Sequence, residues 1–379
     1  MSTAVPTPVA RPSGLDQAPY QLIAPDGRCD AARIDACAVP AAQLLALYRG
    51  MLRIRLMDER LLTMQRQGRI SFYGEARGQE AAVVGTAAAL GPEDYIVPAL
   101  REAGAALYRG LPLAAYIAQI FGNDHDLTRG RQMPCHPGSR AARYVTMSSC
   151  IGTQLPHATG MAMAAQQLRD GHVIAGYMGD GATSEGDFHV ALNFAGVFRA
   201  PVVFVCQNNQ WAISTPVSQQ TATPTMAEKA LAYGLPAVRC DGNDVLACYV
   251  AMRALVARAR RGEGPQFLEA LTYRVSAHSS SDDPSRYRDE SVTAVWREAR
   301  CPLVRFRAFL LGRGLLSPEG DSALREELDA EVRAVITAEE SVAPPPLRSL
   351  IEDVFALVPP HLVEQLAEVA AALPQKPAH

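Results

Sequence analysis

Lysine is almost absent from this chain: among its 379 residues, only Lys229 and Lys376 are lysines. A Walker-type phosphate loop has a lysine directly after its last glycine, and neither lysine stands in such a loop. Pyridoxal phosphate is bound through a Schiff-base lysine, so the same scarcity argues against that cofactor. A dinucleotide-binding glycine pattern starting at Gly179 is also broken, because it would need glycine where Ser184 stands. Three common kinds of phosphate site are therefore disfavoured.

Paired cysteines and long apolar runs are missing as well. The eight cysteines are scattered without any CxxC pair, which is typical of reduced thiols in a cytosolic compartment. No apolar run reaches membrane-spanning length, and the N-terminus lacks a basic region followed by an apolar core. A net charge of −3 predicts no bulk affinity for nucleic acid or membranes. We therefore expect a cytoplasmic protein with neither a nucleic acid nor a membrane as partner.

The chain is long enough for two or three domains, although one large α/β domain is also plausible. We predict an N-terminal arm over residues 1–40, of which the first 29 lack periodicity and look loose. In residues 41–300 strand-like runs alternate with helical ones, which predicts a parallel central sheet with helices on both faces. Residues 301–379 form a predicted helical C-terminal region that carries no chemical motif and is expected to pack on the core or on a partner.

The most informative stretch joins two strand-like runs through a helix. The first run, His172–Met178, ends at a glycine-flanked acid, Asp180. A stretch of helical length follows over Asp187–Arg199, and the second run, Pro201–Cys206, leads into a pair of asparagines that includes Asn209. The helical stretch carries an apolar stripe made of Val190, Phe194, Val197 and Phe198.

Strand, helix and strand in this order predict a parallel unit, whose right-handed crossover brings both strand ends to one edge of the sheet. Asp180 and Asn209 can then share a site. Carboxylate, amide and carbonyl oxygens are hard ligands that suit magnesium, which typically binds through few protein groups plus substrate phosphates. The flanking glycines, Gly179 and Gly181, allow a ligand to approach closely.

The spacing makes this pattern specific. The stretch reads GDG-x26-NN, which closely resembles the thiamine-diphosphate fingerprint of 2-oxo acid decarboxylases and transketolases. The resemblance implies that Asp180, Asn209 and the backbone carbonyl of Trp211 hold magnesium on the diphosphate. It also implies cofactor contacts at Gly179, Gly181 and Ala182. The alternative is that the glycines form an ordinary turn and that the asparagines are a loop dipeptide.

An arginine follows an earlier strand-like run, in Tyr95–Gly104, YIVPALREAG. Taken by itself, Arg101 would most often be a surface or salt-bridged residue. The segment is similar to the YREAG segment of branched-chain 2-oxo acid dehydrogenases, which places Arg101 on the diphosphate. Leu100 stands where those relatives have a tyrosine, so one hydroxyl contact is missing.

The loop Gly130–Gln154 carries several small polar groups into a predicted helix. The family resemblance implies two uses for it. Ile151 would support the bent cofactor, and Ser149 would face the cofactor region as a cofactor-binding and catalytic residue. A potassium ion would be held by the positions Ser148, Cys150, Thr153 and Gln154. The alternative is a plain helix N-terminus capped by Ser148 or Ser149.

The loop Ser276–Arg288, SAHSSSDDPSRYR, follows a predicted core strand. Such an acidic, hydroxyl-rich loop is normally solvated surface. It resembles the HS-x-SDD-x-x-x-YR loop of branched-chain 2-oxo acid dehydrogenases, which implies that His278 contacts the diphosphate and assists transfer to the lipoyl group. The pair Asp282-Asp283 favours the branched-chain class.

From about Ala41 to about Pro360 the chain resembles the α subunit of thiamine-diphosphate 2-oxo acid dehydrogenases, most closely the branched-chain class. The resemblance implies thiamine diphosphate and Mg²⁺, with K⁺ as a further ion. It implies oxidative decarboxylation of a branched-chain 2-oxo acid and acyl transfer to the lipoyl domain of an acyltransferase core. The glutamate that acts on the pyrimidine ring would come from a β subunit in an α2β2 heterotetramer.

The sequence departs from the family pattern at two further positions. Gln207 stands where many branched-chain relatives have a phosphate-binding arginine, and Asp180 replaces a glutamate found in some of them. Two alternative functions stay open at this stage: an α subunit for pyruvate or acetoin, and a non-catalytic metal-binding scaffold subunit.

Overall fold

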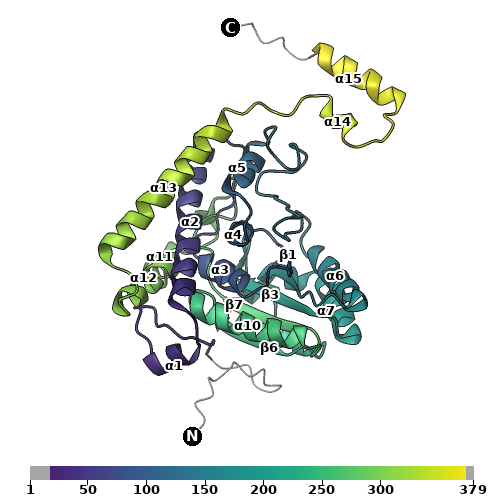
Figure 1. Ribbon diagram of the computed structural model, residues 1–379. Coiled ribbons are helices and arrows are strands. Elements are labelled where there is room, and N and C mark those ends of the chain that lie inside the picture. The colour runs from purple at the N-terminus through teal and green to yellow at the C-terminus, as the bar shows by residue number, and fades with distance from the viewer. Residues whose placement is uncertain (1–17, 373–379) are drawn as a thin grey trace.

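The computed structural model of the protein describes residues 18–372. At its centre lies a five-stranded sheet in which every neighbouring pair of strands is parallel, in the order β1-β2-β3-β7-β6 (Figure 1). Its strands are β1 (Tyr95–Val97), β2 (Ile174–Gly179), β3 (Val202–Asn208), β6 (Ala237–Asp241) and β7 (Gln266–Leu271). A separate antiparallel pair is formed by β4 (Trp211–Ala212) and β5 (Thr215–Pro216).

Both faces of the sheet are covered, which is why its strands are continuous apolar runs. In β3, Val203 and Val205 belong to one apolar cluster, whereas Val202, Phe204 and Cys206 belong to the other. The first cluster includes side chains from α2 (Ala41–Arg66), α3 (Glu80–Ala88), α4 (Ala103–Tyr108) and α10 (Val245–Arg260). The second includes side chains from α6 (Gln154–Leu168), α7 (Gly186–Phe198) and α9 (Met226–Leu231). The predicted α/β class with helices on both faces is confirmed.

The remaining helices are mostly outside these two layers. They are α1 (Ala31–Ala36), α5 (Leu113–Phe121), α8 (Val217–Gln220), α11 (Glu290–Glu298), α12 (Pro302–Gly312), α13 (Pro318–Glu340), α14 (Ser349–Glu352) and α15 (Pro360–Ala372), with 3-10 turns at Asp180–Ser184 and Pro284–Arg286. Among the helices of residues 18–372, none combines the length and the apolar composition that crossing a membrane requires.

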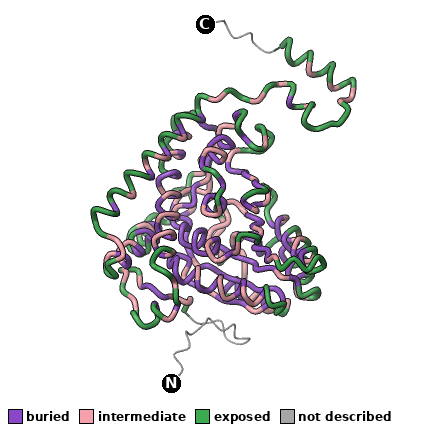
Figure 2. The backbone as a smooth tube through the Cα atoms, in the orientation of Figure 1, coloured by how far each residue is buried: buried purple, intermediate pink, exposed green. Residues whose placement is uncertain are grey.

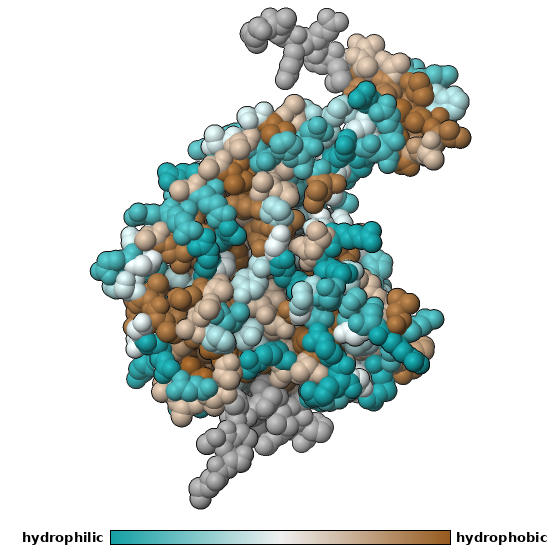
Figure 3. Space-filling view, viewed as in Figure 1, coloured by the Kyte–Doolittle hydropathy of each residue, from teal (hydrophilic) through white to brown (hydrophobic). Residues whose placement is uncertain are grey.

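The predicted helical C-terminal region has two parts that differ in packing. Helix α13 lies along α2, buries Leu328, Val332 and Ile336, and forms ion pairs such as Arg49–Glu327 and Arg60–Asp329. Helix α15 buries no residue and projects away from the body of the protein (Figure 2). Its apolar side chains are brown at the upper right of Figure 3. The first part therefore belongs to the core, whereas the second buries none of its residues within the described chain.

The apolar stripe of α7 is not the face that packs on the sheet. Its members are about half or more exposed: Val190, Phe194, Val197 and Phe198. The helix instead buries Phe188, Ala191, Leu192 and Ala195 against the second cluster. The spacing of apolar residues along a helix identifies an apolar face, but α7 has two apolar faces. Only the tertiary structure shows which of them packs on the sheet.

Part of the predicted N-terminal arm is anchored. Residues 1–17 lie outside the described part of the chain. Tyr20 continues the sheet beyond β6, because its amide donates to the carbonyl of Arg239 at 2.9 Å and its carbonyl accepts from the amide of Asp241 at 3.0 Å. The expectation that the segment up to residue 29 is loose is therefore wrong from Tyr20 onward.

Candidate active site

Asp180 stands directly after β2, at the carboxyl edge of the sheet, and is only 1% exposed. Burial raises its pKa, and this is opposed first by Gln220, whose Nε2 donates to Oδ2 at 2.9 Å. Weaker opposition comes from Arg274 and from the backbone amide of Asn209. Asp180 and Asn209 therefore meet at one edge, as the strand order predicted, and the buried carboxylate has an environment that a cation would improve.

The two glycines beside Asp180 do different things. A Cβ on Gly181 would lie 2.6 Å from the Cβ of Ala212, so this glycine lets the turn after β2 pack against β4. A Cβ on Gly179 would meet no atom within 4 Å. The expected close approach of a ligand is thus possible at Gly179, whereas Gly181 serves the packing of the protein itself.

Asn209 is held in one orientation. Its Nδ2 donates to Oε1 of Gln79 at 3.0 Å, and its Oδ1 accepts from the amide of Trp211 at 3.2 Å. Between them Gln210 has φ +71°, in the left-handed region that a non-glycine residue rarely adopts and that often marks a functional turn. The side-chain oxygen of Asn209, which is a harder metal ligand than its nitrogen, therefore faces the loop at Trp211.

Two buried side chains that the sequence did not single out shape this turn. Gln79 is fully buried, and its Nε2 has no hydrogen-bond partner, which is costly unless a ligand or water supplies one. Arg274 is 1% exposed, and its Nη2 donates to the carbonyl of Ile213 at 2.7 Å, while Nη1 lies 3.5 Å from the carbonyl of Trp211. Burial lowers the pKa of Arg274 to about 10, so it stays a cation at neutral pH.

Arg101 and His278 lie together, although 177 positions separate them. The Arg101 guanidinium donates to the backbone carbonyls of Glu75 and His278, and its Nη2 lies 3.5 Å from Nδ1 of His278. Arg101 is 6% exposed, so it is not a surface residue, and among residues 18–372 it forms no side-chain salt bridge. Burial, followed by Arg101 and Arg274, lowers the pKa of His278 to about 4. His278 is therefore neutral at pH 7.

The loop that carries His278 is folded onto Arg274 rather than solvated. Asp282 accepts at Oδ2 from the amide of His278 at 2.7 Å and from the hydroxyl of Tyr287 at 2.5 Å. The same Tyr287 hydroxyl accepts from Nη2 of Arg274 at 2.6 Å. Although burial alone would raise the pKa of Asp282, these donors and the nearby cations hold it below its usual value. The acidic residue thus fixes the loop.

The loop before α6 does not cap the helix. Thr153 is the N-cap residue, and its side chain makes no capping bond, so the capping alternative for Ser148 and Ser149 is wrong. Ser149 is exposed, and its Oγ lies 2.5 Å from Nε2 of His136. His136 was missed because nothing in its sequence neighbourhood marks it.

The predicted potassium positions and Ile151 lie around this loop. Ser148 accepts at Oγ from the amide of Cys150 at 3.2 Å, and Nε2 of Gln154 donates to the carbonyl of Tyr177 at 3.0 Å. Gln154 therefore turns its Oε1 away from that carbonyl. Ile151 is 59% exposed, as an apolar support for a ligand would be.

The two departures from the family pattern have definite places. Gln207 is buried, its Nε2 donates to Oε1 of Glu102, and its own Oε1 has no partner. Burial raises the pKa of Glu102 to about 7. Leu100 is half-buried beside Arg101. Gln207 thus pairs with an internal acid and brings no positive charge to this position.

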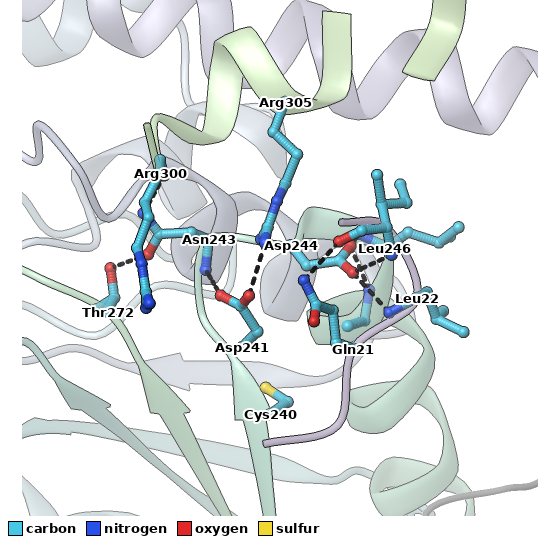
Figure 4. A network of polar contacts seen from close by, with 12 residues as sticks. Gln21, Leu22, Cys240, Asp241, Asn243, Asp244, Leu246, Thr272, Arg300 and Arg305 are labelled. Carbon is cyan, nitrogen blue, oxygen red and sulfur yellow. Dashed lines mark hydrogen bonds and ion pairs between the residues drawn. The ribbon is translucent and has the colours of Figure 1, made fainter. Parts of the chain in front are cut away.

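A second acidic segment follows the outermost strand, β6, at the carboxyl edge of the same sheet (Figure 4). Asp244 is fully buried and accepts four backbone amides. Its Oδ2 accepts from Leu22 at 2.8 Å and Ile23 at 2.7 Å, and its Oδ1 accepts from Leu246 and Ala247 at 3.1 Å. Nearby, Arg305 donates to Oδ2 of Asp241 at 2.8 Å. This segment anchors the chain near its N-terminus.

The arrangement fits a magnesium diphosphate. Asp180, Asn209 and the Trp211 carbonyl offer hard oxygens after two neighbouring strands, Gly179 borders open space, and Gln79 offers an unpaired donor. Arg274 supplies cationic character beside them through its contacts with the carbonyls of Trp211 and Ile213.

In open parallel α/β sheets, ligands bind outside the carboxyl ends of the strands, which is where Asp180 and Asn209 lie. The family model described as "Dehydrogenase E1 component" matches residues 48–347, and the chain belongs to this family.

Several relatives share most of the chain. The 3-methyl-2-oxobutanoate dehydrogenase subunit alpha of Mycobacterium tuberculosis is 45% identical over 329 residues, 86% of each chain. The 2-oxoisovalerate dehydrogenase subunit alpha 2, mitochondrial, of Arabidopsis thaliana is 44% identical over 84% of this chain and 68% of its own. The human 2-oxoisovalerate dehydrogenase subunit alpha, mitochondrial, is 40% identical over 88% of this chain and 75% of its own.

Proposed function

We propose that this chain is the α subunit of a thiamine-diphosphate-dependent branched-chain 2-oxo acid dehydrogenase. It acts in the oxidative decarboxylation of a branched-chain 2-oxo acid and in acyl transfer to a lipoyl group. The observation that carries the proposal is the meeting of Asp180 and Asn209 at the carboxyl ends of adjacent strands, in a chain that belongs to the E1 family. The names of the relatives supply the branched-chain class.

In this proposal Asp180, Asn209 and the Trp211 carbonyl would hold Mg²⁺. Arg101 and His278 would contact the diphosphate, and Gly179, Gly181 and Ala182 form the turn that would lie beside it. When bound, thiamine diphosphate would supply the nucleophilic carbon and the electron sink that decarboxylation of a 2-oxo acid needs.

The chain's own residues bind and orient. The neutral imidazole of His278 can accept a proton or donate a hydrogen bond. Because its pKa is lowered, His278 does not place a second positive charge beside Arg101 at neutral pH. Ile151 gives apolar support to a bent ligand, and Ser148, Cys150, Thr153 and Gln154 are the proposed surroundings of a potassium ion. Asp282 and Tyr287 hold the His278 loop in place.

Two exposed apolar surfaces favour the binding of a partner chain. They are the outer face of α7 and the unpacked helix α15. We propose that a β subunit covers such surfaces in an α2β2 heterotetramer and completes the active site, and that the lipoyl domain of the acyltransferase core is a second partner. The cytoplasmic location stays a prediction.

The test is a reconstitution. The purified chain is assayed for carbon dioxide release from 3-methyl-2-oxobutanoate, first alone and then with the β subunit of its complex, with pyruvate as the competing substrate. We expect no turnover by the chain alone and preferential turnover of the branched substrate after addition of the β subunit. Full decarboxylation by the α chain alone would refute the divided site, and a preference for pyruvate would refute the branched-chain class.

A further inference from the structure

His136 is fixed on three sides within the protein. Its side chain is 4% exposed, and its ring Nδ1 lies 3.0 Å from the carbonyl oxygen of Pro134. Its backbone amide donates to Oε1 of Gln119 at 3.2 Å, and Nε2 of Gln119 donates to the carbonyl of Met133 at 2.7 Å. The ring therefore has one orientation, which points Nε2 at Ser149.

These contacts decide where the proton of the imidazole lies. A carbonyl oxygen only accepts hydrogen bonds, so Nδ1 must carry the hydrogen that meets Pro134. In a neutral imidazole Nε2 is then an acceptor, and the Ser149 hydroxyl, 2.5 Å away, donates its only proton to it. The Ser149 proton is directed into the protein, and its lone pairs remain for the exposed side.

We propose that His136 is a positioning residue that makes Ser149 a hydrogen-bond acceptor towards the active site. Ser149 would then take an N–H donor, such as the amino group on the pyrimidine ring of the proposed cofactor. It would not take a diphosphate oxygen, because an ionised phosphate also only accepts. A bond from Ser149 to the diphosphate would require His136 to be doubly protonated.

The assignment rests on the proposed function only in naming the ligand, because the tautomer belongs to the chain itself. Nitrogen-15 spectra of the histidine-labelled chain without cofactor should show His136 with its proton on Nδ1, with the signal assigned by its loss in His136→Gln. A proton on Nε2, or on both nitrogens, would overturn the proposal whatever the enzyme's substrate is.

The state of the loaded protein is read by calorimetry. Thiamine diphosphate with Mg²⁺ is titrated into the assembled enzyme in two buffers of different ionisation enthalpy, for the wild type and for Ser149→Ala. The number of protons taken up on binding should be the same in both proteins. An excess of about one proton in the wild type would mean that Ser149 donates to the diphosphate, and would overturn the proposal.

A double-mutant cycle separates positioning from a structural role. We expect Ser149→Ala to cost about 5- to 20-fold in the affinity or rate that uses the contact, which corresponds to one hydrogen bond. His136→Gln should cost a similar factor alone but almost nothing in the Ser149→Ala background. If His136→Gln costs the same in both backgrounds, His136 acts on the fold and not through Ser149.

The same variants identify the donor. A larger dissociation constant for thiamine diphosphate in Ser149→Ala means that the cofactor carries the group that donates to Ser149. An unchanged cofactor affinity would mean that the cofactor donates no hydrogen bond to Ser149, and would overturn the proposal.

Discussion

Two buried aspartates stand at the carboxyl ends of strands in one sheet, yet they differ in how many hydrogen bonds the chain donates to them. Asp180 follows β2 and Asp244 lies just beyond β6, and both pKa values are raised by burial. Asp244 receives four backbone amides, two of them from the segment at Leu22 and Ile23. Asp180 receives one side-chain donor, Gln220.

The difference lies in what remains to be satisfied. Both oxygens of Asp244 are occupied by the chain, so its position at the edge of the sheet serves stability. The surroundings of Asp180 include an unpaired donor on Gln79 and open space beside Gly179, so its site is completed from outside. A buried acid at a strand end therefore indicates a ligand site only where the chain leaves its neighbours unsatisfied.

The largest expected effect is on ligand binding at Asp180. Asp180→Ala should weaken Mg²⁺-dependent binding of thiamine diphosphate about 100-fold, because the charged ligand of the proposed magnesium site is lost. Calorimetry measures the affinity, and circular dichroism of the cofactor-free chain should be unchanged. Asp244→Ala is the matched control, and its folded fraction should keep the affinity within about 2-fold. Equal losses in the two variants would break the comparison.

Stability should respond in the reverse order. Asp244→Ala removes the acceptor of four amides and the cap of α10, which should cost about 2–4 kcal/mol of unfolding free energy. The segment around Leu22 should also become open to proteolysis. Urea unfolding followed by fluorescence measures the first, and timed digestion the second. The idea of an internal anchor fails if Asp244→Ala unfolds at the same urea concentration as the wild type.

The smallest effect concerns acid sensitivity on the Asp180 side. His278 has a pKa of about 4, below its usual 6.5, because of burial and of Arg101 and Arg274, with Asp282 opposing them. As the pH falls, the His278 side chain is protonated in the unfolded chain before it is protonated in the folded one. The contribution of His278 to the free energy of unfolding is therefore fully present above about pH 6.5 and is lost as the pH falls towards 4.

His278→Gln should remove this part of the acid sensitivity. Between pH 7 and pH 4.5 its melting temperature should fall about 1–3 °C less than that of the wild type. His157→Gln, at an exposed position of α6, is the control and should behave like the wild type. Parallel curves for wild type and His278→Gln would mean that His278 is as solvated in the folded chain as in the unfolded one.

Much of the fold and part of the site could be predicted from the sequence. Apolar runs of strand length and the long periodic helix at Ala41–Arg66 gave the elements, because burial on two faces or on one leaves a mark in neighbouring positions. The same local marks placed Asp180 and Asn209 after adjacent strands. Helix α7 shows the limit of this reasoning, because both its buried face and its exposed face are apolar.

What the sequence determined by itself was the GDG-x26-NN spacing, the parallel sheet and the segments carrying Arg101 and His278. Only the tertiary structure decided which groups satisfy one another: Gln79 with Asn209 across 130 positions, and Asp244 with Leu22 across 222. It also turned His136 towards Ser149. Periodicity records which side of an element is buried, whereas hydrogen-bond direction depends on atoms that meet only when distant segments pack together.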